Sequence, residues 1–586
     1  MLKEAQKLAA LSNGFSRRPA AFSRNLATTF DAVLVEPHSR PSYRNDKEQN
    51  VMQSNGTRRN FLATCVAGGA GALYSATAFA KPAAKPPQHG IFNVRDFGAS
   101  ATGQVLDTKA IQSAIDAAGQ SGGVVYLPPG TYLSGTLFLK SHVALHLEAG
   151  AELLGSKNLA DYPHVQPEIR SYTDNYVNQS LIYAENLEDV SLAGKGTING
   201  QGASFKALHA FFNRPYLIRM VNCRRVQVSD LTLLNSPMWV QHYLACEDLL
   251  VRGLSVHSRC NVNNDGIDVD ACENVRIADC EFYSGDDSIV LKSTLDRLCR
   301  NVVVTNCVIS SLQDALKLGT ESVGGFENIT MTNCAIYKSR VGIALETVDG
   351  GKLENVSVSG IVMRDVGGPI FLRLGNRARP AYKGAPQPGL GSFRNVTISN
   401  VRIVGADKIG SSISGLPNCE IENVTLDNID IQCVGGGTKE DAARKIPEFP
   451  KKYPDYAMFG ILPAYGFYCR HVKNLKLLNT QVTCESKDAR PALVCEDAAG
   501  LRASDFAGSN SDPMVVLRDV RDGLLDGNRA PAGNKVYLRL EGAQTEDISL
   551  VANDLHRSEK PIELTGEVRP GSVWLSPALR TLQPAG

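Results

Sequence analysis

Four short stretches of this chain carry polar residues at matching positions. The stretches are NDGIDVD (264–270), DDSIVLK (286–292), QDALKLG (313–319) and RVGIALE (340–346). They start 22, 27 and 27 residues apart. If they lie side by side, Asp265, Asp287 and Asp314 form one column, with Asp286 beside Asp287. Carboxyl groups at such short distances raise one another's pKa. The spacing therefore predicts a site that holds both a protonated acid and an ionised base.

Such a carboxyl cluster suits the cleavage of a glycosidic bond. In that reaction one carboxyl protonates the leaving oxygen and another activates water. Asp286 and Asp287 are adjacent, so a straight strand would point them to opposite faces, and we expect Gly285 to allow a bend through which both reach solvent. A polar corner ladder, solvated or holding calcium, is the alternative interpretation, but four acids on the corners of three coils favour catalysis.

The elements that position these acids are the strands of a repeat. Apolar residues alternate within each stretch, as Ile267 and Val269 do, which is the period of a strand with one buried face. A second strand signature, typified by CENVRIADCEF (272–282), recurs between residues 223 and 482. Val, Ile and Thr dominate the strands, and Asn, Asp and Gly mark the corners. A strand repeat of about 20–30 residues predicts an all-β solenoid, here a single right-handed parallel β-helix.

The open N-terminal end of a solenoid needs a cap. The stretch DTKAIQSAIDAA (107–118) is the clearest helix pattern, with Asp107 as N-cap and an apolar stripe, and we expect it to cover the first coil. Beyond about residue 490 we expect less regular coils. The predicted organisation is an N-terminal extension with an export signal (1–80), a linker (81–90) and the β-helix (91–586), with loop insertions near 373–392 and 433–468.

The N-terminal region carries the pattern of a twin-arginine export signal. Residues 57–62 read TRRNFL, and a weakly apolar Ala/Gly-rich run follows, ending in Ala78-Phe79-Ala80. The run is too short and too rich in glycine to span a membrane. Met52 lies just before the arginines and is the start that we expect, with export to the periplasm or beyond. A chance Arg-Arg pair and a lipoprotein site at Cys65 are the alternatives.

Composition limits the cofactors and partners. The 14 cysteines include Cys280, Cys307 and Cys334, which are 27 residues apart. Twin-arginine substrates fold in a reducing cytosol, so we expect a ladder of buried free thiols, with disulfides between neighbours as the alternative. No cysteine pair has zinc spacing, and we assign neither metal nor cofactor. The 61 basic and 60 acidic residues give no support to nucleic-acid or membrane binding. We expect a monomer whose partner is an oligo- or polysaccharide.

From FNVRDFGA (92–99) to about residue 480, the sequence resembles the polygalacturonases, glycoside hydrolase family 28 of the pectin-lyase-fold superfamily, as a divergent bacterial member. Gly285-Asp286-Asp287 matches the family's Gly/Gln-Asp-Asp, and Asn263-Asn264-Asp265 matches its Asn-Thr-Asp more loosely. The resemblance implies that Asp286 is the general acid and that Asp265 and Asp287 hold and deprotonate the attacking water. It also implies an inverting reaction without a metal.

Two motifs of that family are missing. The register places Gln313–Ala315 at its Gly-His-Gly and Ala344–Glu346 at its Arg-Ile-Lys, which grips the galacturonate carboxylate. Losing both cations removes the charge-assisted pairing that a uronic acid needs. We therefore expect a secreted hydrolase of pectic or related plant saccharides that does not favour plain polygalacturonate. Either the sugar at that position is neutral, or the cations come from elsewhere.

The residues expected to bind substrate surround the acids. They are Asp314, Lys317, Glu346, Arg373, Lys292 and Tyr465. Arg373 falls one coil after Glu346, where it either pairs with Glu346 or contacts substrate, and Arg377 is a second candidate. The insertions supply aromatic residues that either stack on sugars or pack their loops down, and large loops can block one end of a groove and make the enzyme exo-acting. These aromatic residues are Tyr382, Tyr453, Tyr456, Phe459, Tyr465 and Tyr468, followed by His471. Trp239 and His242 either line the cleft or are buried.

Two other functions fit the same fold. A polysaccharide lyase would use Lys292 or Lys317 as the base and the aspartates as a calcium site. It would form an unsaturated uronide and lose activity with chelators. A non-catalytic carbohydrate-binding or adhesin β-helix has no need of three acids in one cleft. The sequence leaves the identity of the sugar and exo or endo action open.

Overall fold

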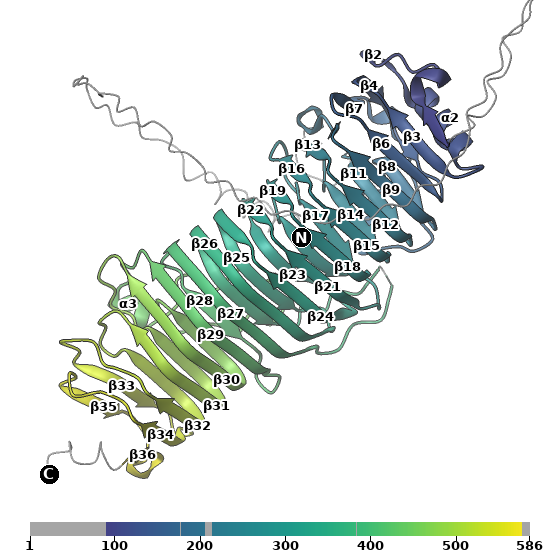
Figure 1. The fold of residues 1–586 in the computed structure, drawn as a ribbon. Coiled ribbons are helices and arrows are strands. Elements are labelled where there is room, and N and C mark those ends of the chain that lie inside the picture. Colours follow the sequence, from purple (N-terminus) through teal and green to yellow (C-terminus); the bar gives the residue numbers. More distant parts are fainter. Residues whose placement is uncertain (1–89, 176, 206–213, 383, 577–586) are drawn as a thin grey trace, which may run out of the picture. The chain divides into compact units, whose positions relative to one another are not determined.

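The computed structural model describes residues 90–175, 177–205, 214–382 and 384–576, all within the unit Ala83–Gly586. The export signal and Cys65 lie outside the described residues. Strands of successive coils pair in parallel, each with its counterpart in the coil before and the coil after, as β17 does with β14 and β20. The predicted right-handed parallel β-helix is confirmed (Figure 1).

Each coil contributes strands to three faces. The first face contains β1 (Ile91–Asn93), β3 (Gly123–Leu127), β6 (Val143–Leu147), β9 (Glu188–Gly194), β12 (Arg224–Ser229), β15 (Glu247–Arg252), β18 (Glu273–Ala278), β21 (Cys299–Thr305), β24 (Gly325–Thr332), β34 (Glu546–Val551) and β36 (Val573–Leu575). The second face contains β2 (Thr102–Leu106), β4 (Gly130–Ser134), β7 (Ala151–Gly155), β10 (Thr197–Asn199), β13 (Thr232–Leu234), β16 (Ser255–Ser258), β19 (Glu281–Ser284) and β22 (Val308–Ser311).

The third face carries the acids and is called the site sheet below. It contains β5 (Leu137–Phe138), β8 (Ser180–Glu185), β11 (Tyr216–Val221), β14 (Gln241–Leu244), β17 (Ile267–Asp270), β20 (Ile289–Ser293), β23 (Asp314–Ser322), β28 (Ser411–Ser414), β33 (Val536–Glu541) and β35 (Lys560–Leu564). Longer strands bend at the corners and join the faces into one continuous sheet. These are β25 (Ala335–Thr347), β26 (Lys352–Leu374), β27 (Ser392–Ala406), β29 (Ile421–Cys433), β30 (Phe467–Cys484), β31 (Leu493–Gly508) and β32 (Val515–Asp526).

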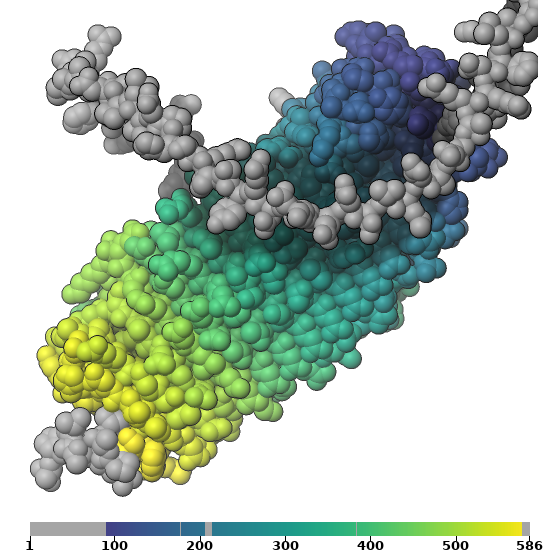
Figure 2. Space-filling model, viewed as in Figure 1, coloured from purple at the N-terminus to yellow at the C-terminus, as the bar shows by residue number. Residues whose placement is uncertain are grey.

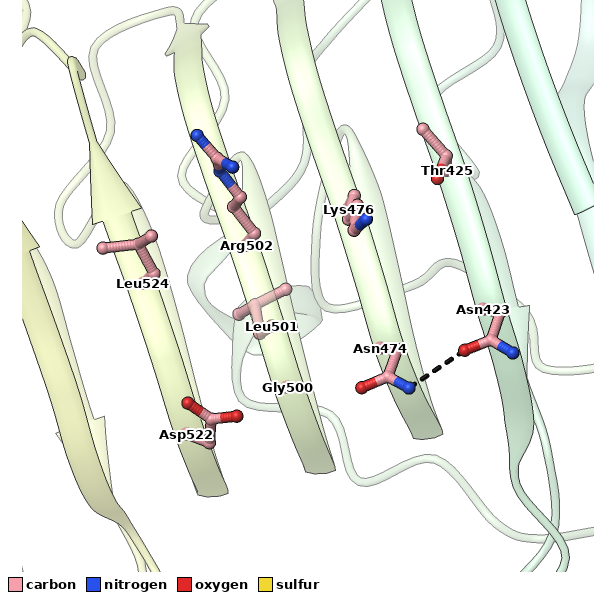
Figure 3. Close-up of a pocket in the computed structure, with 9 residues that line it drawn as sticks. All are labelled: Asn423, Thr425, Asn474, Lys476, Gly500, Leu501, Arg502, Asp522 and Leu524. Carbon is pink, nitrogen blue, oxygen red and sulfur yellow. Dashed lines mark hydrogen bonds between the residues drawn. The ribbon is translucent and has the colours of Figure 1, made fainter. Parts of the chain in front are cut away.

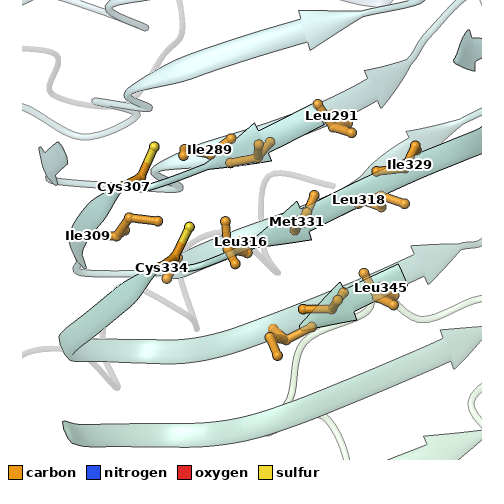
Figure 4. Close-up of a cluster of buried hydrophobic side chains, with 14 of the residues drawn as sticks. Ile289, Leu291, Cys307, Ile309, Leu316, Leu318, Ile329, Met331, Cys334 and Leu345 are labelled. Atoms are coloured by element: carbon orange, nitrogen blue, oxygen red, sulfur yellow. The ribbon is translucent and has the colours of Figure 1, made fainter. Parts of the chain in front are cut away.

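The core consists of columns of inward-facing apolar residues. Ile267, Ile289, Leu316 and Ile343 are register partners on four successive coils, and each is 0% exposed. Figure 4 shows Ile289 and Leu316 in this buried cluster. A buried aliphatic side chain contributes about 1.5–3 kcal/mol. Truncating one to alanine costs about 2–5 kcal/mol, so the columns fix the register that aligns the acids.

Asparagine determines the corners that follow the site sheet. Asn274, Asn301 and Asn328 have φ of 58°, 56° and 56°, a left-handed conformation that asparagine tolerates. Their side chains form a ladder, in which Asn301 donates to Asn274 over 3.0 Å and Asn328 donates to Asn301 over 3.3 Å. The repeated asparagine of the second strand signature is therefore explained by corner geometry.

The N-terminal cap is α2 (Thr108–Ala118), which packs against β1, β3 and β5 (Figure 1). Asp107 occupies the N-cap position, but its carboxylate accepts the N–H groups of Ser100 and Ala101 over 2.6 and 2.9 Å, so it stabilises the preceding loop rather than the helix. The less regular C-terminal coils that we expected are only partly found. Strands β31 and β32 stay in register with β30, and the strands shorten only after Asp526.

The remaining helices are short. They are η1 (Val94–Phe97), η2 (Leu159–Asp161), η3 (Tyr172–Asn175), η4 (Gly202–Ser204), α3 (Lys439–Ala442) and η5 (Pro570–Ser572). Among the described residues, no helix is long and apolar enough to cross a membrane. In the space-filling view the coils follow one another as bands in sequence order, as expected where each coil mainly contacts its neighbours (Figure 2).

The cysteine ladder has the predicted arrangement. Cys280, Cys307 and Cys334 each precede strands that pair in register, and all three are buried. Figure 4 shows Cys307 and Cys334 on successive coils. The 13 cysteines of the described chain are free thiols.

Candidate active site

The acids meet at the corner where the chain enters the site sheet. Asp265 lies two residues before β17, Asp286 and Asp287 lie just before β20, and Asp314 opens β23. Backbone contacts connect them, because the N–H of Asp286 donates to the carbonyl of Asn264 over 3.3 Å and the N–H of Asp314 donates to Oδ1 of Asp287 over 3.2 Å. The repeat spacing therefore brings all four predicted acids together.

Gly285 is needed for close packing rather than for a special bend. Its φ is not positive, and its N–H donates to the carbonyl of Ser258 over 2.7 Å. A Cβ at this position would lie 3.2 Å from Cα of Arg259 and 3.2 Å from Cβ of Asn264. The expected bend is thus corrected: glycine lets the acidic corner approach the loop that carries Asp265.

Asn264 fixes that loop. Its side chain is 0% exposed, and its Nδ2 donates to the carbonyls of Ser236 and Met238 over 2.8 and 3.0 Å. Its Oδ1 accepts the N–H groups of Cys260 and Asn261 over 3.1 and 2.9 Å. An amide that satisfies four backbone groups holds the carboxyl of the next residue in one position.

Burial and mutual repulsion separate the protonation states of the acids. Burial, reinforced by Asp268 and Asp286, raises the pKa of Asp265 well above its usual value. Burial and the charge of Asp287 raise the pKa of Asp286 to about 7. Asp287, in contrast, has its Oδ2 3.0 Å from Nζ of Lys317. The site therefore offers a carboxyl that keeps its proton near neutral pH beside a carboxylate that is paired with a cation.

The two lysines proposed as substrate ligands are both enclosed by acids. Nζ of Lys317 also lies 2.6 Å from Asp314, and Nζ of Lys292 lies 3.1 Å from Glu321 and 3.5 Å from Asp268. Burial alone would lower the pKa of each lysine, but the carboxylates raise both well above the usual range. These ammonium groups are charged and engaged, so they cannot act as bases.

Glu346 lies in the same cluster. It is 1% exposed, and burial raises its pKa to about 8, although Lys317 opposes the shift. Its Oε2 accepts the hydroxyl of Thr320 over 3.2 Å, and that hydroxyl is 3.1 Å from the hydroxyl of Tyr453. Tyr453 is 55% exposed and comes from the insertion between β29 and β30. A loop residue thus reaches the hydroxyl that hydrogen-bonds to Glu346.

Arg373 does not reach the cluster, and its predicted role is corrected. It is the register partner of Glu346, but its guanidinium donates to the carbonyls of Gly415 and Glu448 over 3.1 and 2.8 Å and to Oγ of Ser414 over 2.9 Å. It is 1% exposed. Arg373 therefore neither pairs with Glu346 nor is free for substrate, because it anchors the second insertion.

Tyr465 is likewise a structural residue rather than a substrate ligand. It is 2% exposed, belongs to the main core, and donates its hydroxyl to the carbonyl of Ser509 over 2.8 Å. Tyr468 donates to Glu496 over 2.7 Å, and His471 contacts Asp497 at 2.6 Å. These aromatic rings hold coils and loops together.

The second insertion covers the site sheet beyond the acids. Apolar residues between β29 and β30 pack on the outer face of the sheet, where they form one buried cluster. The cluster contains Val341, Ala344, Phe371, Ile446, Met458, Phe459, Leu462, Ala464, Tyr468, Val494 and Val516. Ala344, at the position of a missing cation, is 1% exposed and is thus core rather than cleft. The second insertion therefore covers the site sheet from β25, the strand that carries Ala344 and Glu346.

The opposite side of the acids is also enclosed. Trp239 and His242 are 6% and 0% exposed, and their rings pack at 5.2 Å, so both are buried. Nζ of Lys292 lies 4.8 Å above the Trp239 ring. The first insertion sends Arg379 over the ring of Tyr172 at 3.8 Å. The acids therefore lie between two covered stretches of the site sheet.

Several charged residues of the site were not predicted from the sequence. Asp268 is 0% exposed, and strand alternation next to the buried Ile267 and Val269 is a signal that would have found it. Burial would raise the pKa of Glu321, but the charges of Lys292 and Arg379 hold it well below its usual value. Glu321 lies past an irregularity in β23 that breaks the repeat, so the repeat does not predict it. Arg214, which donates to Oδ1 of Asn263 over 2.9 Å, lies outside the repeats and gives no such signal.

The four predicted acids do not have the spacing of a metal-binding site. Within the described residues, one triad of His, Asp and Glu has metal-like spacing, His142 with Glu188 and Asp189. Arg225 already occupies it, because its guanidinium contacts Asp189 at 2.6 Å and Glu188 at 2.7 Å.

A shallow depression on another face is also distinct from the acids. Figure 3 shows its lining residues, Asn423, Thr425, Asn474, Lys476, Gly500, Leu501, Arg502, Asp522 and Leu524. Asn474 donates to Asn423 over 2.9 Å, and Gly500 interrupts this asparagine ladder (Figure 3). With a single carboxyl group, Asp522, the depression lacks the pair that acid–base catalysis requires.

Comparisons with known proteins agree with this geometry. The model of the glycosyl hydrolases family 28 matches residues 131–452. A probable polygalacturonase of Vitis vinifera is 38% identical over 218 residues, which are 34% of this chain and 44% of that protein. An exo-poly-alpha-D-galacturonosidase of Dickeya chrysanthemi is 28% identical over 251 residues, 34% of this chain and 41% of that protein. The match thus spans less than half the length of either relative.

The fold agrees with a solved structure as well. The family 28 exopolygalacturonase of Yersinia enterocolitica superposes with a TM-score of 0.53 and 21% sequence identity, over 74% of this chain and 78% of that one.

Proposed function

Because the chain belongs to the glycosyl hydrolases family 28, we propose that it hydrolyses glycosidic bonds of pectic or related plant saccharides with inversion of configuration. Asp286 is the general acid, Asp287 deprotonates the attacking water, and Asp265, whose pKa is raised by burial, helps to hold that water. The observation that supports these roles is the contrast between two adjacent acids. The pKa of Asp286 is raised to about 7, whereas Asp287 is paired with Lys317 at 3.0 Å.

Proton balance follows from this contrast. The leaving oxygen takes the proton of Asp286, and a water molecule gives its proton to a carboxylate on the opposite side of the bond as its oxygen attacks the anomeric carbon. One glycosidic bond breaks and one bond to the water oxygen forms. The test is to incubate purified protein with pectic oligosaccharides and rhamnogalacturonan fragments and to follow the anomer of the first product by NMR. An initial product with retained configuration would rule the mechanism out.

The two covered stretches of the site sheet support exo action. The second insertion buries Ala344 and Phe371 on one side, and Trp239 and His242 are buried on the other. A long polymer lying across the acids would have to cross one of these covered stretches, which favours action at a chain end. Product analysis decides this: an exo enzyme releases one size of small product from the start, whereas a ladder of intermediate oligosaccharides would contradict it.

The surroundings of Glu346 support a preference for a sugar other than plain galacturonate. The cations nearest to the acids, Lys292 and Lys317, are each held between two carboxyl groups. A substrate carboxylate would have to displace one of them to find a charged partner. A neutral or differently charged pectic sugar needs no such displacement.

The lyase interpretation loses support at the same residues. Its base would be a neutral lysine, but the pKa values of Lys292 and Lys317 are raised well above the usual range by the surrounding carboxylates. An unsaturated product with near-ultraviolet absorption would nevertheless restore that interpretation.

We also propose export by the twin-arginine pathway, which the TRRNFL stretch supports. Replacing both arginines by lysine, R58K/R59K, is expected to leave the protein in the cytoplasm of the producing cell. Export of this variant at the normal level would contradict the proposal.

A further inference from the structure

Lys317 is enclosed between carboxylates from two successive coils. Its Nζ lies 2.6 Å from Oδ2 of Asp314 and 3.0 Å from Oδ2 of Asp287, and the residue is 4% exposed. As the register partner of Val290, it projects from the outer face of the site sheet, beside the acidic corner. An ammonium group has three N–H donors, and two of them are engaged here. This lysine is built into the carboxyl cluster.

The contacts of Lys317 distinguish the two adjacent aspartates. Both oxygens of Asp287 are held, since Oδ1 accepts the N–H of Asp314 over 3.2 Å and Oδ2 contacts the ammonium. Asp286 accepts the N–H of Asp287 over 3.1 Å, and in the described part of the chain it forms no ion pair. One carboxylate is thus fixed and neutralised, and its neighbour is left to hold a proton.

We infer that Lys317 is a positioning residue that holds the carboxylate of Asp287 in place for the attacking water, and that Asp314 moderates this effect by sharing the ammonium charge. The inference rests on the proposed function, because it assigns the water-activating role to Asp287. It replaces the view of Lys317 and Asp314 as substrate ligands. Lys317 need not touch the substrate, since it acts through Asp287.

The arrangement predicts opposite effects for the two partners. Without Lys317, Asp287 and Asp314 are buried carboxyl groups near one another with no shared cation, which favours proton uptake by the cluster and should move the acidic limb of the pH profile up. Without the charge of Asp314, the ammonium charge acts on Asp287 alone, which should move the acidic limb down. The other titratable groups that face this cluster are unchanged in both variants. They are Asp265, Asp268, Asp286, Lys292, Glu346, Tyr453 and, beside Asp314, Arg340.

The first test compares the pH dependence of kcat/KM for the full-length protein and two variants, K317M and D314N. We expect the acidic limb to move up by roughly 1–3 pH units in K317M, the usual effect of losing an adjacent opposite charge, and to move down in D314N. The exposed Lys476, on another face, provides the control K476M, whose profile should match the wild type. An unshifted acidic limb in K317M, or a shift of both variants in the same direction, would overturn the inference.

A second test does not depend on activity. Removing one member of a buried ion pair strands the other, whereas removing both is much less costly. K317M should therefore melt at a lower temperature than the wild type at neutral pH. K317M/D287N should recover part of that loss, because Asp314 still lacks its cation, and K317M/D287N/D314N should recover most of it. If the double variant were as unstable as K317M, Lys317 would not be paired with Asp287. If instead the wild type hydrolysed no pectic saccharide, the proposed function would fail while the melting data still tested the pair.

Discussion

Oε2 of Glu346 accepts a hydrogen bond from the hydroxyl of Thr320 over 3.2 Å. Burial raises the pKa of this glutamic acid to about 8, with Lys317 opposing the shift and Asp314 and Asp287 adding to it. At neutral pH the side chain is thus largely a neutral carboxylic acid, able to donate a hydrogen bond. A position that reads as a negative charge in the sequence is a polar neutral group in the folded protein.

Replacing Glu346 with glutamine should change how stability depends on pH. The folded-state pKa of about 8 exceeds the ordinary value of 4.5, so the folded protein binds a proton that the unfolded chain releases. The stability contributed by Glu346 is therefore fully present below about pH 4.5 and is lost as the pH rises through about 8. E346Q cannot ionise, so its stability should fall less than that of the wild type across this window. Parallel curves of denaturation midpoint against pH would contradict the shifted pKa.

Single asparagine substitutions at Asp286, Asp265 and Asp287 should each abolish most of the activity. General acid–base groups contribute about 10²–10⁴-fold to turnover, so kcat should fall by that amount while the far-ultraviolet circular dichroism is unchanged. D314N should retain more activity than these three, because Asp314 contacts Lys317 rather than the water. Turnover close to wild type in D286N would remove Asp286 as the general acid.

The fold was predictable because strand alternation and corner asparagines repeat with the coil. A period of 27 residues brings Asp287 and Asp314 together without knowledge of any side-chain contact. Alternation also predicts which face Ile289 and Leu316 occupy. What repeats in a solenoid can be predicted, because each coil obeys the same geometry as its neighbours.

The roles of residues beside the insertions could not be predicted in this way. Register places Arg373 next to Glu346, but the acceptors of Arg373 include the carbonyl of Glu448, 75 residues further along the chain. An insertion has no repeat register, so the position of its carbonyl groups is invisible in the sequence. For the same reason, the sequence could not separate the aromatic loop residues near the site from those in the core. Tyr453 reaches Thr320, whereas Tyr465 lies in the core.

Arg373 should therefore matter for stability rather than for substrate recognition. In R373M the carbonyls of Gly415 and Glu448 lose their donor, and a buried polar group left unpaired costs about 1–3 kcal/mol. We expect a lower melting temperature and faster proteolysis within residues 434–466. Arg518, on the same face but with its side chain 42% exposed, offers the control R518M, which should melt close to the wild type. A normal melting temperature for R373M combined with a large rise in KM would instead make Arg373 a substrate ligand.

Plain polygalacturonate should be a poor substrate or none. A buried uronate carboxylate without a cation costs several kcal/mol, and Lys317 is already shared by Asp287 and Asp314. Oligosaccharides that offer a neutral pectic sugar, such as rhamnose or galactose, should be cleaved faster, as measured by mass analysis of the products. E346K, which introduces a cation at the position of a missing one, should increase the relative rate on polygalacturonate.

Brisk release of galacturonic acid by the wild type would show this specificity to be wrong. The source of the missing cation would then have to be a partly exposed arginine at the edge of the site. Arg377 is bound to Asp349 with its side chain 13% exposed, and Arg373 is bound to the second insertion. Arg340 and Arg379 are also paired, with Asp455 and Glu321, but their side chains are 33% and 23% exposed, which makes them the arginines that a substrate could reach. R340A and R379A would then be expected to raise KM for polygalacturonate while leaving kcat on neutral oligosaccharides unchanged. Equal losses on both substrates would show that neither arginine selects for the uronate.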